Sequence, residues 1–227
     1  MHIAIILDGN RRFARKRGIP EWKGHEHGAK KVNEMIEWCN ELGVKELTLY
    51  AFSMENFDRP KKEVKAIFKL FEENIKKLRK SEDFRKKDVK VRFIGRLDMF
   101  PKGIVNEMKW LMAETDGKNG LTVNFAMAYG GRQEIVDAVK KIAPNIREGK
   151  IKEKDIDEKL LNKNMYLISE PELVIRPGGE RRISNFLIWQ SYYSEWHFTE
   201  KLWPEFTKED LIEAINDYKN RERRFGL

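Results

Sequence analysis

Short apolar runs alternate with longer amphipathic segments along the whole chain. The run HIAIIL at residues 2–7 is continuously apolar, which predicts a buried β-strand. Comparable runs predict four more strands, at residues 46–52, 89–95, 121–128 and 173–176. Apolar residues at helical spacing predict five helices, at residues 26–42, 58–78, 101–115, 132–147 and 207 to about 222, the second of them opened by Asp58 and Pro60. The charged stretch 150–162 is also expected to be helical.

This alternation of strands and helices predicts an α/β fold with a mostly parallel sheet. We expect about six strands, flanked by helices on both faces. The chain of 227 residues is long enough for one substantial core, and no shift in composition, repeat or low-complexity linker divides it. A single domain over residues 1–227 is therefore predicted.

The charge of the chain indicates an anionic partner. Lys and Arg outnumber Asp and Glu by 45 to 37, giving a net charge of +8. Nucleic acid, a membrane surface and a phosphate-bearing small molecule would each fit this balance. The single cysteine, Cys39, cannot form an internal disulfide, and no signal peptide or long apolar span is recognised, so we expect a cytoplasmic protein. The abundance of Lys and Glu, with only two glutamines, is typical of thermophiles.

Three polar clusters follow predicted strands, and each contains arginine. They are DGNRR at residues 8–12, SMENFDRP at 53–60 and RPGGERRISNF at 176–186. Ligands of open parallel sheets bind outside the carboxyl ends of the strands, where these clusters should converge. Arginines and free backbone amides bind phosphate oxygens, and a nearby carboxylate could hold Mg²⁺ against them. The clusters together predict a site for a substrate with several phosphates.

Each cluster also has an ordinary structural interpretation. The DG pair could be a simple turn, ENFDRP a helix entry capped by Asp58, and RPGGERR a solvated turn. The three clusters stand at matching strand ends. An ordinary structural role for all three at once is therefore less favoured than a shared binding site. The GHEHG segment does not predict zinc, because His25 and His27 are two residues apart and would not share a helical face. The apolar stripe from Val64 to Leu78, like Cys39, is typical of core packing.

Several segments closely resemble the cis-prenyltransferase family, of the undecaprenyl diphosphate synthase type. They are LDGNRRFARKRG, GHEHGAKKV, LTLYAFSMENFDRP, NFAMAYGGRQEI, RPGGERRISNFLIWQSYYSEWHF and the final RERRFGL, in this order. The resemblance implies a homodimer that adds isopentenyl diphosphate units to an allylic diphosphate, farnesyl or geranylgeranyl, with Mg²⁺ as cofactor. The implied product is a long-chain Z-polyprenyl diphosphate, the precursor of a glycosyl carrier lipid. A hydrophobic tunnel would hold it, lined in part by Ala51 and the stripe from Val64 to Leu78, and its release could involve peripheral contact with a membrane.

The resemblance also assigns roles to individual residues. Asp8 is expected to engage Mg²⁺ and the allylic diphosphate, with His25 assisting departure of the diphosphate and Asn56 as a further catalytic residue. Glu195 is expected to contact the metal across the dimer. The implied substrate-binding residues are Gly9, Asn10, Arg11, Arg12 and Phe13 around the allylic diphosphate, Ser53, Glu55, Phe57 and Arg59 in a loop that closes over the substrates, Arg176, Arg182 and Ser184 for isopentenyl diphosphate, and Arg224 and Gly226 at the partner's site.

Four positions depart from the family's pattern. Glu21 stands where many members have arginine, and Arg11 often corresponds to glycine. Pro177 replaces a small polar residue, and Phe57 replaces tryptophan. These departures leave the motif set intact and bear on the choice of substrate, and Glu21 affects one expected contact with the allylic diphosphate.

Three other functions are weighed against this prediction. A trans-prenyltransferase would carry DDxxD motifs on an all-helical fold, and this sequence has neither. A non-catalytic partner subunit of a cis-prenyltransferase usually lacks the DGN and SxEN motifs, which are both present. A nucleic-acid-binding module would present a basic stripe with stacking aromatic residues, whereas the basic residues here cluster with acids and glycines.

Overall fold

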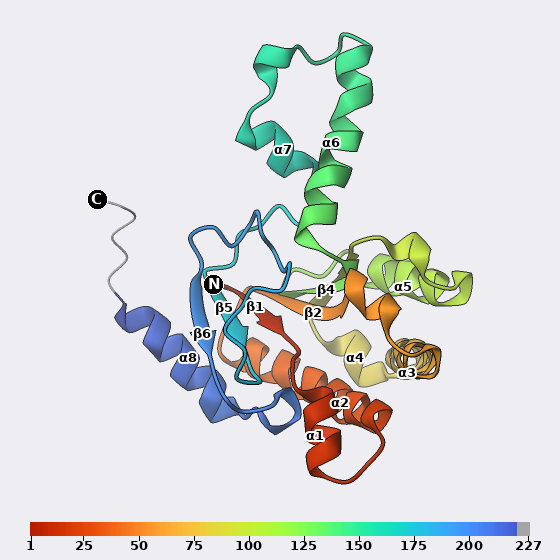
Figure 1. The fold of residues 1–227 in the computed structure, drawn as a ribbon, viewed down its shortest axis with the longest axis vertical. Helices are drawn as coiled ribbons and strands as arrows, with labels where there is room; N and C mark the ends of the chain where they lie inside the picture. The colour runs from red at the N-terminus through yellow and green to blue at the C-terminus, as the bar shows by residue number, and fades with distance from the viewer. Residues whose placement is uncertain (222–227) are drawn as a thin grey trace.

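Six parallel strands form one sheet at the centre of the molecule (Figure 1). The computed structural model describes residues 1–221, apart from the side chain of Asp83. The sheet order is β3-β4-β2-β1-β5-β6, and every neighbouring pair is parallel. The strands are β1 (His2–Ile6), β2 (Glu46–Ser53), β3 (Val89–Ile94), β4 (Leu121–Tyr129), β5 (Leu173–Arg176) and β6 (Glu195–Phe198).

Eight α-helices and four short 3₁₀ turns connect these strands in the described residues. The helices are α1 (Asn10–Lys16), α2 (Glu21–Glu41), α3 (Lys61–Lys80), α4 (Glu82–Lys86), α5 (Lys102–Thr115), α6 (Gly131–Arg147), α7 (Glu158–Asn164) and α8 (Lys208–Asn220). The 3₁₀ turns are η1 (Met54–Asp58), η2 (Leu97–Met99), η3 (Glu153–Asp155) and η4 (Trp203–Glu205). No helix in residues 1–221 has the length and apolar character needed to cross a membrane.

The predicted α/β class and parallel sheet are confirmed, and the five predicted strands lie at the expected places. The sixth strand, β6, was not located from the sequence, because EWHF is a four-residue edge strand whose side chains are all only half-buried. Helix α2 begins at Glu21, five residues earlier than predicted. The charged stretch 150–162 forms the turn η3 and the start of α7 rather than one continuous helix.

Alternate residues of each strand face different layers. Ile3 and Ile5 of β1 face a core formed with α2, α3, α5 and α8, to which Met35, Met108 and Leu211 contribute. Ala4 and Ile6 face a smaller core covered mainly by loop residues, among them Leu167, Phe186 and Leu187. The helices are thus concentrated on one face, while α6 and α7 project from the body of the molecule (Figure 1).

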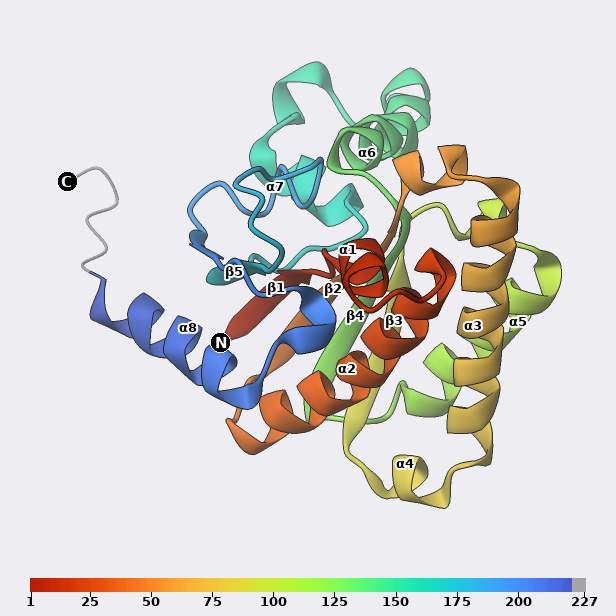
Figure 2. The ribbon, with the colours of Figure 1, turned by 60° about the horizontal axis from the view of Figure 1, so that its bottom comes forward.

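The sheet order brings three of the loops together. Strand β1 lies between β2 and β5, so the chain leaves β1 in one direction and later returns on its other side. Such a reversal of strand order opens a crevice at the carboxyl ends of the strands. Figure 2 shows these three strands together in the sheet. Residues of the loops after β1, β2 and β5 line one crevice, and these are the loops that carry the three polar clusters.

Candidate active site

Asp8 lies at the centre of the crevice, between two arginines. Its Oδ1 accepts a hydrogen bond from Arg12 Nη2 at 3.1 Å, and its Oδ2 accepts one from Arg176 Nη2 at 2.9 Å. Arg176 is 3% exposed and also donates to Ser184 Oγ at 2.8 Å. The first and third polar clusters are therefore joined through a single carboxylate.

Two glycines on α2 allow the first loop to approach closely. A Cβ on Gly24 would lie 2.1 Å from the backbone oxygen of Asn10, and one on Gly28 would lie 2.2 Å from Asn10 Oδ1. Gly9 itself has a φ of 105°, which favours glycine at the start of α1. The geometry of the Asp8 loop thus depends on residues that lack side chains.

We expect Gly24→Ala to destabilise the protein by about 1–3 kcal/mol, because its methyl group would push against a backbone carbonyl that cannot move aside easily. Gly103→Ala is the matched control, since a Cβ at this helical glycine of α5 meets nothing within 4 Å. The control should leave stability unchanged or raise it by up to about 1 kcal/mol. Urea unfolding measures both, and equal effects of the two variants would contradict the packing role of Gly24.

The second polar cluster is ordered by its own hydrogen bonds. The backbone N–H of Ser53 donates to Asn56 Oδ1 at 3.2 Å, as part of a capping box at the start of η1. Glu55 accepts a hydrogen bond from Asn185 Nδ2 at 3.1 Å, which connects this loop to the third cluster. Ser53, Glu55 and Asn56 therefore face the same crevice as Asp8.

His25 and Arg59 share a buried carboxylate behind the crevice. Glu63 Oε1 lies 3.2 Å from His25 Nε2 and 3.1 Å from Arg59 Nη1. Burial lowers the pKa of His25 and also that of Arg59, and the hydrogen bonds to Glu63 oppose both shifts. His25 belongs to α2 and Arg59 follows η1, so Glu63 links two elements that border the site.

Two of the departures from the family's pattern lie in contact with one another. Arg11 Nη2 is 2.5 Å from Glu21 Oε2, and Arg15 Nε is 2.9 Å from Glu21 Oε1. The hydrogen bond from Arg11 is the main cause that lowers the pKa of Glu21. Glu21 therefore offsets the repulsion between two arginines of the basic run after Asp8.

The crevice opens into a cavity of about 860 Å³ between the sheet and helices α2 and α3. Its head is polar, with Asp8, Arg12 and Arg176 among the lining residues, and its deeper part is almost entirely apolar. The deeper lining consists of Val32, Ile36, Ala51, Ile67, Leu70, Phe71, Asn74, Ile75, Leu78, Phe84, Val89, Val91, Phe93, Leu111, Phe125 and Met127. The predicted apolar stripe of α3 thus divides, because all of it packs against the core but Val64 and Phe68 do not line the cavity.

The strand register gives the depth of this cavity. Val91 of β3 pairs with Val123 of β4, which pairs with Leu47 of β2. Leu47 lies four residues before Ala51, so Val91 is about 13 Å deeper than Ala51 along the strand direction. The cavity therefore extends along most of the length of the sheet.

The structure brings most of the predicted site residues to the head of this cavity. The lining includes Asp8, Gly9, Asn10, Arg11, Arg12, His25, Ser53, Glu55, Asn56, Arg59, Arg176, Arg182 and Ser184. Phe13 and Phe57 are outside this lining: Phe13 contacts His27, with ring centroids 5.0 Å apart, and Phe57 packs against Phe52. Their expected contact with substrate stays a prediction.

Glu195 lies away from Asp8 within one chain. It begins β6 opposite Leu173, at the other end of β5 from Arg176, and its Oε2 accepts a hydrogen bond from Arg221 Nη1 at 2.7 Å. A role of Glu195 at a metal site would therefore have to involve a second subunit. Arg224 and Gly226 lie outside the described residues.

Sequence reasoning missed several residues that shape the site. Glu63 was counted only as part of a helix, although it is a carboxylate only four residues after Arg59, with which it pairs. Gly24 and Gly28 gave a usable signal too, since two glycines four residues apart in a helix permit close approach of another segment. Glu180, which lies 2.5 Å from Arg182, was noted only as part of the third motif.

These features define a class of protein: an α/β protein with a site for anionic groups at a switch point and for an extended apolar chain beneath them. Residues 6–226 match the family model described as "Putative undecaprenyl diphosphate synthase". The chain belongs to this family, the cis-prenyltransferases, as the motifs predicted, and it is a prenyltransferase.

Individual relatives agree with this assignment. A "Tritrans,polycis-undecaprenyl-diphosphate synthase (geranylgeranyl-diphosphate specific)" from Methanopyrus kandleri is 47% identical, over 99% of this chain and 84% of that protein. An "Isoprenyl transferase" from Clostridium perfringens is 45% identical, over 99% of this chain and 89% of that protein. Among solved structures, this chain is similar to lavandulyl diphosphate synthase from Lavandula x intermedia, in complex with dimethylallyl diphosphate. The two chains are 34% identical with a TM-score of 0.92, and the match covers 100% of this chain and 98% of the synthase chain.

Proposed function

We propose that the chain extends geranylgeranyl diphosphate by successive condensations with isopentenyl diphosphate. The product is a long-chain Z-polyprenyl diphosphate that serves as precursor of a glycosyl carrier lipid. The observation that carries this proposal is one continuous cavity with an arginine-rich head and a long apolar body. The relatives whose names specify geranylgeranyl diphosphate support this starter over farnesyl diphosphate.

The deep cavity also bears on the type of product. Apolar side chains of β2, β3, β4, α3 and α5 line it well below the polar head. Burial of each CH₂ group of a growing chain would contribute about 0.8 kcal/mol, so the cavity would retain intermediates between condensations. This retention favours repeated addition over a single coupling.

Asp8 is the residue that would hold Mg²⁺. Mg²⁺ is usually bound by one or two carboxylates together with phosphate oxygens of the substrate. No three His, Cys, Asp or Glu side chains in the described part of the chain are placed to hold a metal by themselves, and the Asp8 carboxylate faces the polar head. This donor set fits a metal shared with a diphosphate, and a bound Mg²⁺ would neutralise charge on that diphosphate. Glu195 would contribute only from the partner subunit.

The arginines of the head would stabilise the leaving group. Breaking the allylic C–O bond increases the negative charge on the departing diphosphate. Arg12, fixed by Asp8 and by the carbonyl of Gly178, can donate to that group without rearrangement. Such preorganised donors stabilise the transition state more than the ground state. His25, Asn56 and Arg59 line the same head, and the family's roles for these residues fit this geometry.

The third cluster would hold isopentenyl diphosphate. Arg176 is buried and fixed, whereas the Arg182 side chain is 62% exposed and pairs with Glu180. Ser184 Oγ accepts a hydrogen bond from Arg176. Holding the second diphosphate here would keep the isopentenyl alkene facing the developing allylic cation.

Removal of the Arg182 guanidinium should therefore weaken one substrate selectively. We expect Arg182→Ala to raise the KM for isopentenyl diphosphate about tenfold, since charge-assisted hydrogen bonds to phosphate are the strong ones. The KM for the allylic diphosphate should change less than twofold. Steady-state kinetics with each substrate varied in turn measures both constants, with the surface variant Arg79→Ala as control. A joint rise of both constants would refute separate diphosphate sites.

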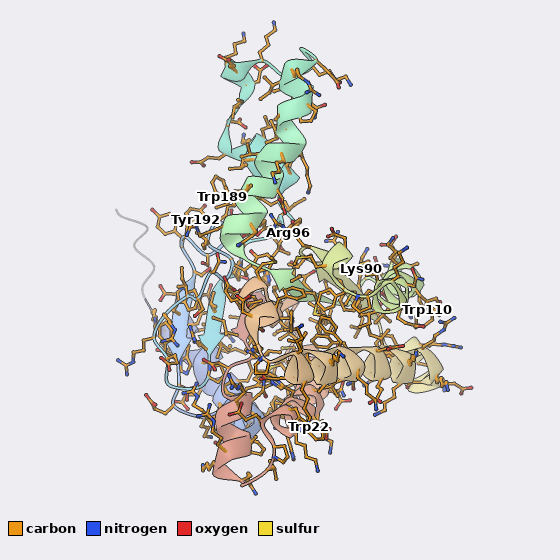
Figure 3. All side chains as sticks on the ribbon, turned by 45° about the vertical axis from the view of Figure 1, so that its right-hand side comes forward. Trp22, Lys90, Arg96, Trp110, Trp189 and Tyr192 are labelled. Atoms are coloured by element: carbon orange, nitrogen blue, oxygen red, sulfur yellow. The ribbon has the colours of Figure 1, made fainter. Side chains whose placement is uncertain are left out.

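The protein is further proposed to be a cytoplasmic homodimer. Val136 and Val139 of α6 are about half exposed, and an apolar groove between α6 and α7 is lined by Ile142, Leu161 and Trp189. Trp189 and Tyr192 lie near the base of this projecting arm (Figure 3). A second copy of the chain would cover these side chains.

The apolar product is proposed to leave through peripheral contact with a membrane. Consumption of labelled isopentenyl diphosphate in the presence of an allylic diphosphate and Mg²⁺ tests the catalytic proposal.

A further inference from the structure

Glu63 is a buried carboxylate that contacts basic groups from three separate elements. It lies in the first turn of α3 and is 7% exposed. Its Oε1 accepts from Arg59 Nη1 at 3.1 Å, lies 3.2 Å from His25 Nε2, and is 3.8 Å from Arg11 Nε. These three partners come from the end of η1, from α2 and from α1.

The three partners line the head of the cavity, whereas Glu63 stands behind them. A buried carboxylate is costly unless it is paired, and here two hydrogen-bonding partners and a third nearby guanidinium compensate it. Without this charge, Arg11 and Arg59 would repel one another across the same pocket. Glu63 therefore fixes the spacing of the basic groups that face the ligand, although Glu63 itself does not face the ligand.

The head of the cavity is divided between two carboxylates. Asp8 holds Arg12 and Arg176 on the side of β1 and β5. Glu63 holds Arg59 and His25 on the side of α2 and α3. Glu63 thus fixes basic groups that Asp8 does not contact.

We infer that Glu63 is a positioning residue for the allylic diphosphate, acting through Arg59 and His25. This inference rests on the proposed function. It assigns Glu63 no contact with substrate. The carboxylate keeps a guanidinium and an imidazole at a fixed separation, so that both reach one diphosphate without first reorganising.

Two substitutions of Glu63 separate its geometry from its charge. Glu63→Ala removes the acceptor, and Glu63→Gln keeps an oxygen that can still accept from Arg59. We expect Glu63→Ala to raise the KM for geranylgeranyl diphosphate about tenfold and Glu63→Gln to raise it less, since hydrogen bonds to charged groups carry this order of effect. The KM for isopentenyl diphosphate should stay within twofold of wild type. Glu72→Ala is the matched control, because Glu72 is an exposed carboxylate of the same helix, paired with Lys76.

Calorimetric binding of inorganic pyrophosphate to the same variants gives a readout independent of turnover. Weaker binding by Glu63→Ala, with recovery in Glu63→Gln, would support positioning. Tighter binding by Glu63→Ala would show that Glu63 only competes with the diphosphate for its arginines, and would overturn the inference. A lower melting temperature with both KM values unchanged would overturn it as well. If Glu63→Ala does not fold, the KM of Glu63→Gln for geranylgeranyl diphosphate decides the inference. A KM above that of wild type would support positioning, and an unchanged KM would overturn it. A wild-type protein that consumes no isopentenyl diphosphate would refute the proposed function, and pyrophosphate binding would still decide the role of Glu63.

Discussion

Asp8→Ala is expected to reduce turnover at least about a hundredfold, which corresponds to about 2.7 kcal/mol of transition-state stabilisation. Asp8 orients Arg12 and Arg176 from opposite sides and is the carboxylate placed to share Mg²⁺ with the diphosphate. Its loss would release both arginines and remove the metal ligand together. The fold should survive, because Asp8 lies in a loop and its side chain is 27% exposed.

The control for this variant is Asp116→Ala. Asp116 is also an ion-paired aspartate, with Lys90 as its partner, but its side chain is 79% exposed and is not part of the cavity lining. Turnover of the control should equal that of wild type, and circular dichroism should show folded protein for both variants. Wild-type activity should disappear with EDTA and return with Mg²⁺. Near-normal turnover of Asp8→Ala would refute the role of this carboxylate.

Narrowing the cavity at two depths is expected to shorten the product by two different amounts. Ala51 lies near the polar head, and Val91 lies about 13 Å deeper by strand register. A phenylalanine at either position would fill space that the growing chain needs. Ala51→Phe should therefore stop elongation early, Val91→Phe should stop it later, and wild type should give the longest product.

Arg92→Phe is the matched control for this series. It places the same side chain on the next residue of β3, which is exposed. Chromatography of the dephosphorylated products measures chain length for all four proteins. The control should match wild type. If Val91→Phe and wild type gave the same length while Val91→Phe remained folded and active, the deep cavity would not hold the product.

The fold was predictable where apolar patterning is strong. A strand inside a parallel sheet is buried on both faces, so a continuous apolar run such as HIAIIL predicts a strand from the sequence alone. Strand β6 gave no such signal, since an edge strand needs fewer apolar residues, and all four residues of EWHF, two of them polar, are half-buried. The early start of α2 was missed because Gly24 and Gly28 lower helix propensity. Those glycines are kept helical by packing against Asn10, which the sequence alone cannot display.

The site was predictable to the extent that it resides in contiguous motifs. The residues Asp8, Ser53 and Arg176 stand at or just after the ends of strands, so the sequence alone points to them. The sheet order then places them together. Glu63 lacks such a marker, because its role arises from contacts with α1 and α2 that are distant in sequence. The pairing of Glu21 with Arg11 likewise depends on the angle between two helices. Contacts of this kind appear only once the chain is folded.

The central claim is that one cavity serves both a pair of diphosphates and a long growing chain. Its most direct test is the product formed from geranylgeranyl diphosphate, labelled isopentenyl diphosphate and Mg²⁺, resolved by chain length and analysed by NMR for double-bond geometry. We predict a long-chain polyprenyl diphosphate in which many isopentenyl units have been added, each with a Z double bond. A product that contains a single added unit, or E double bonds at the added units, would contradict the account.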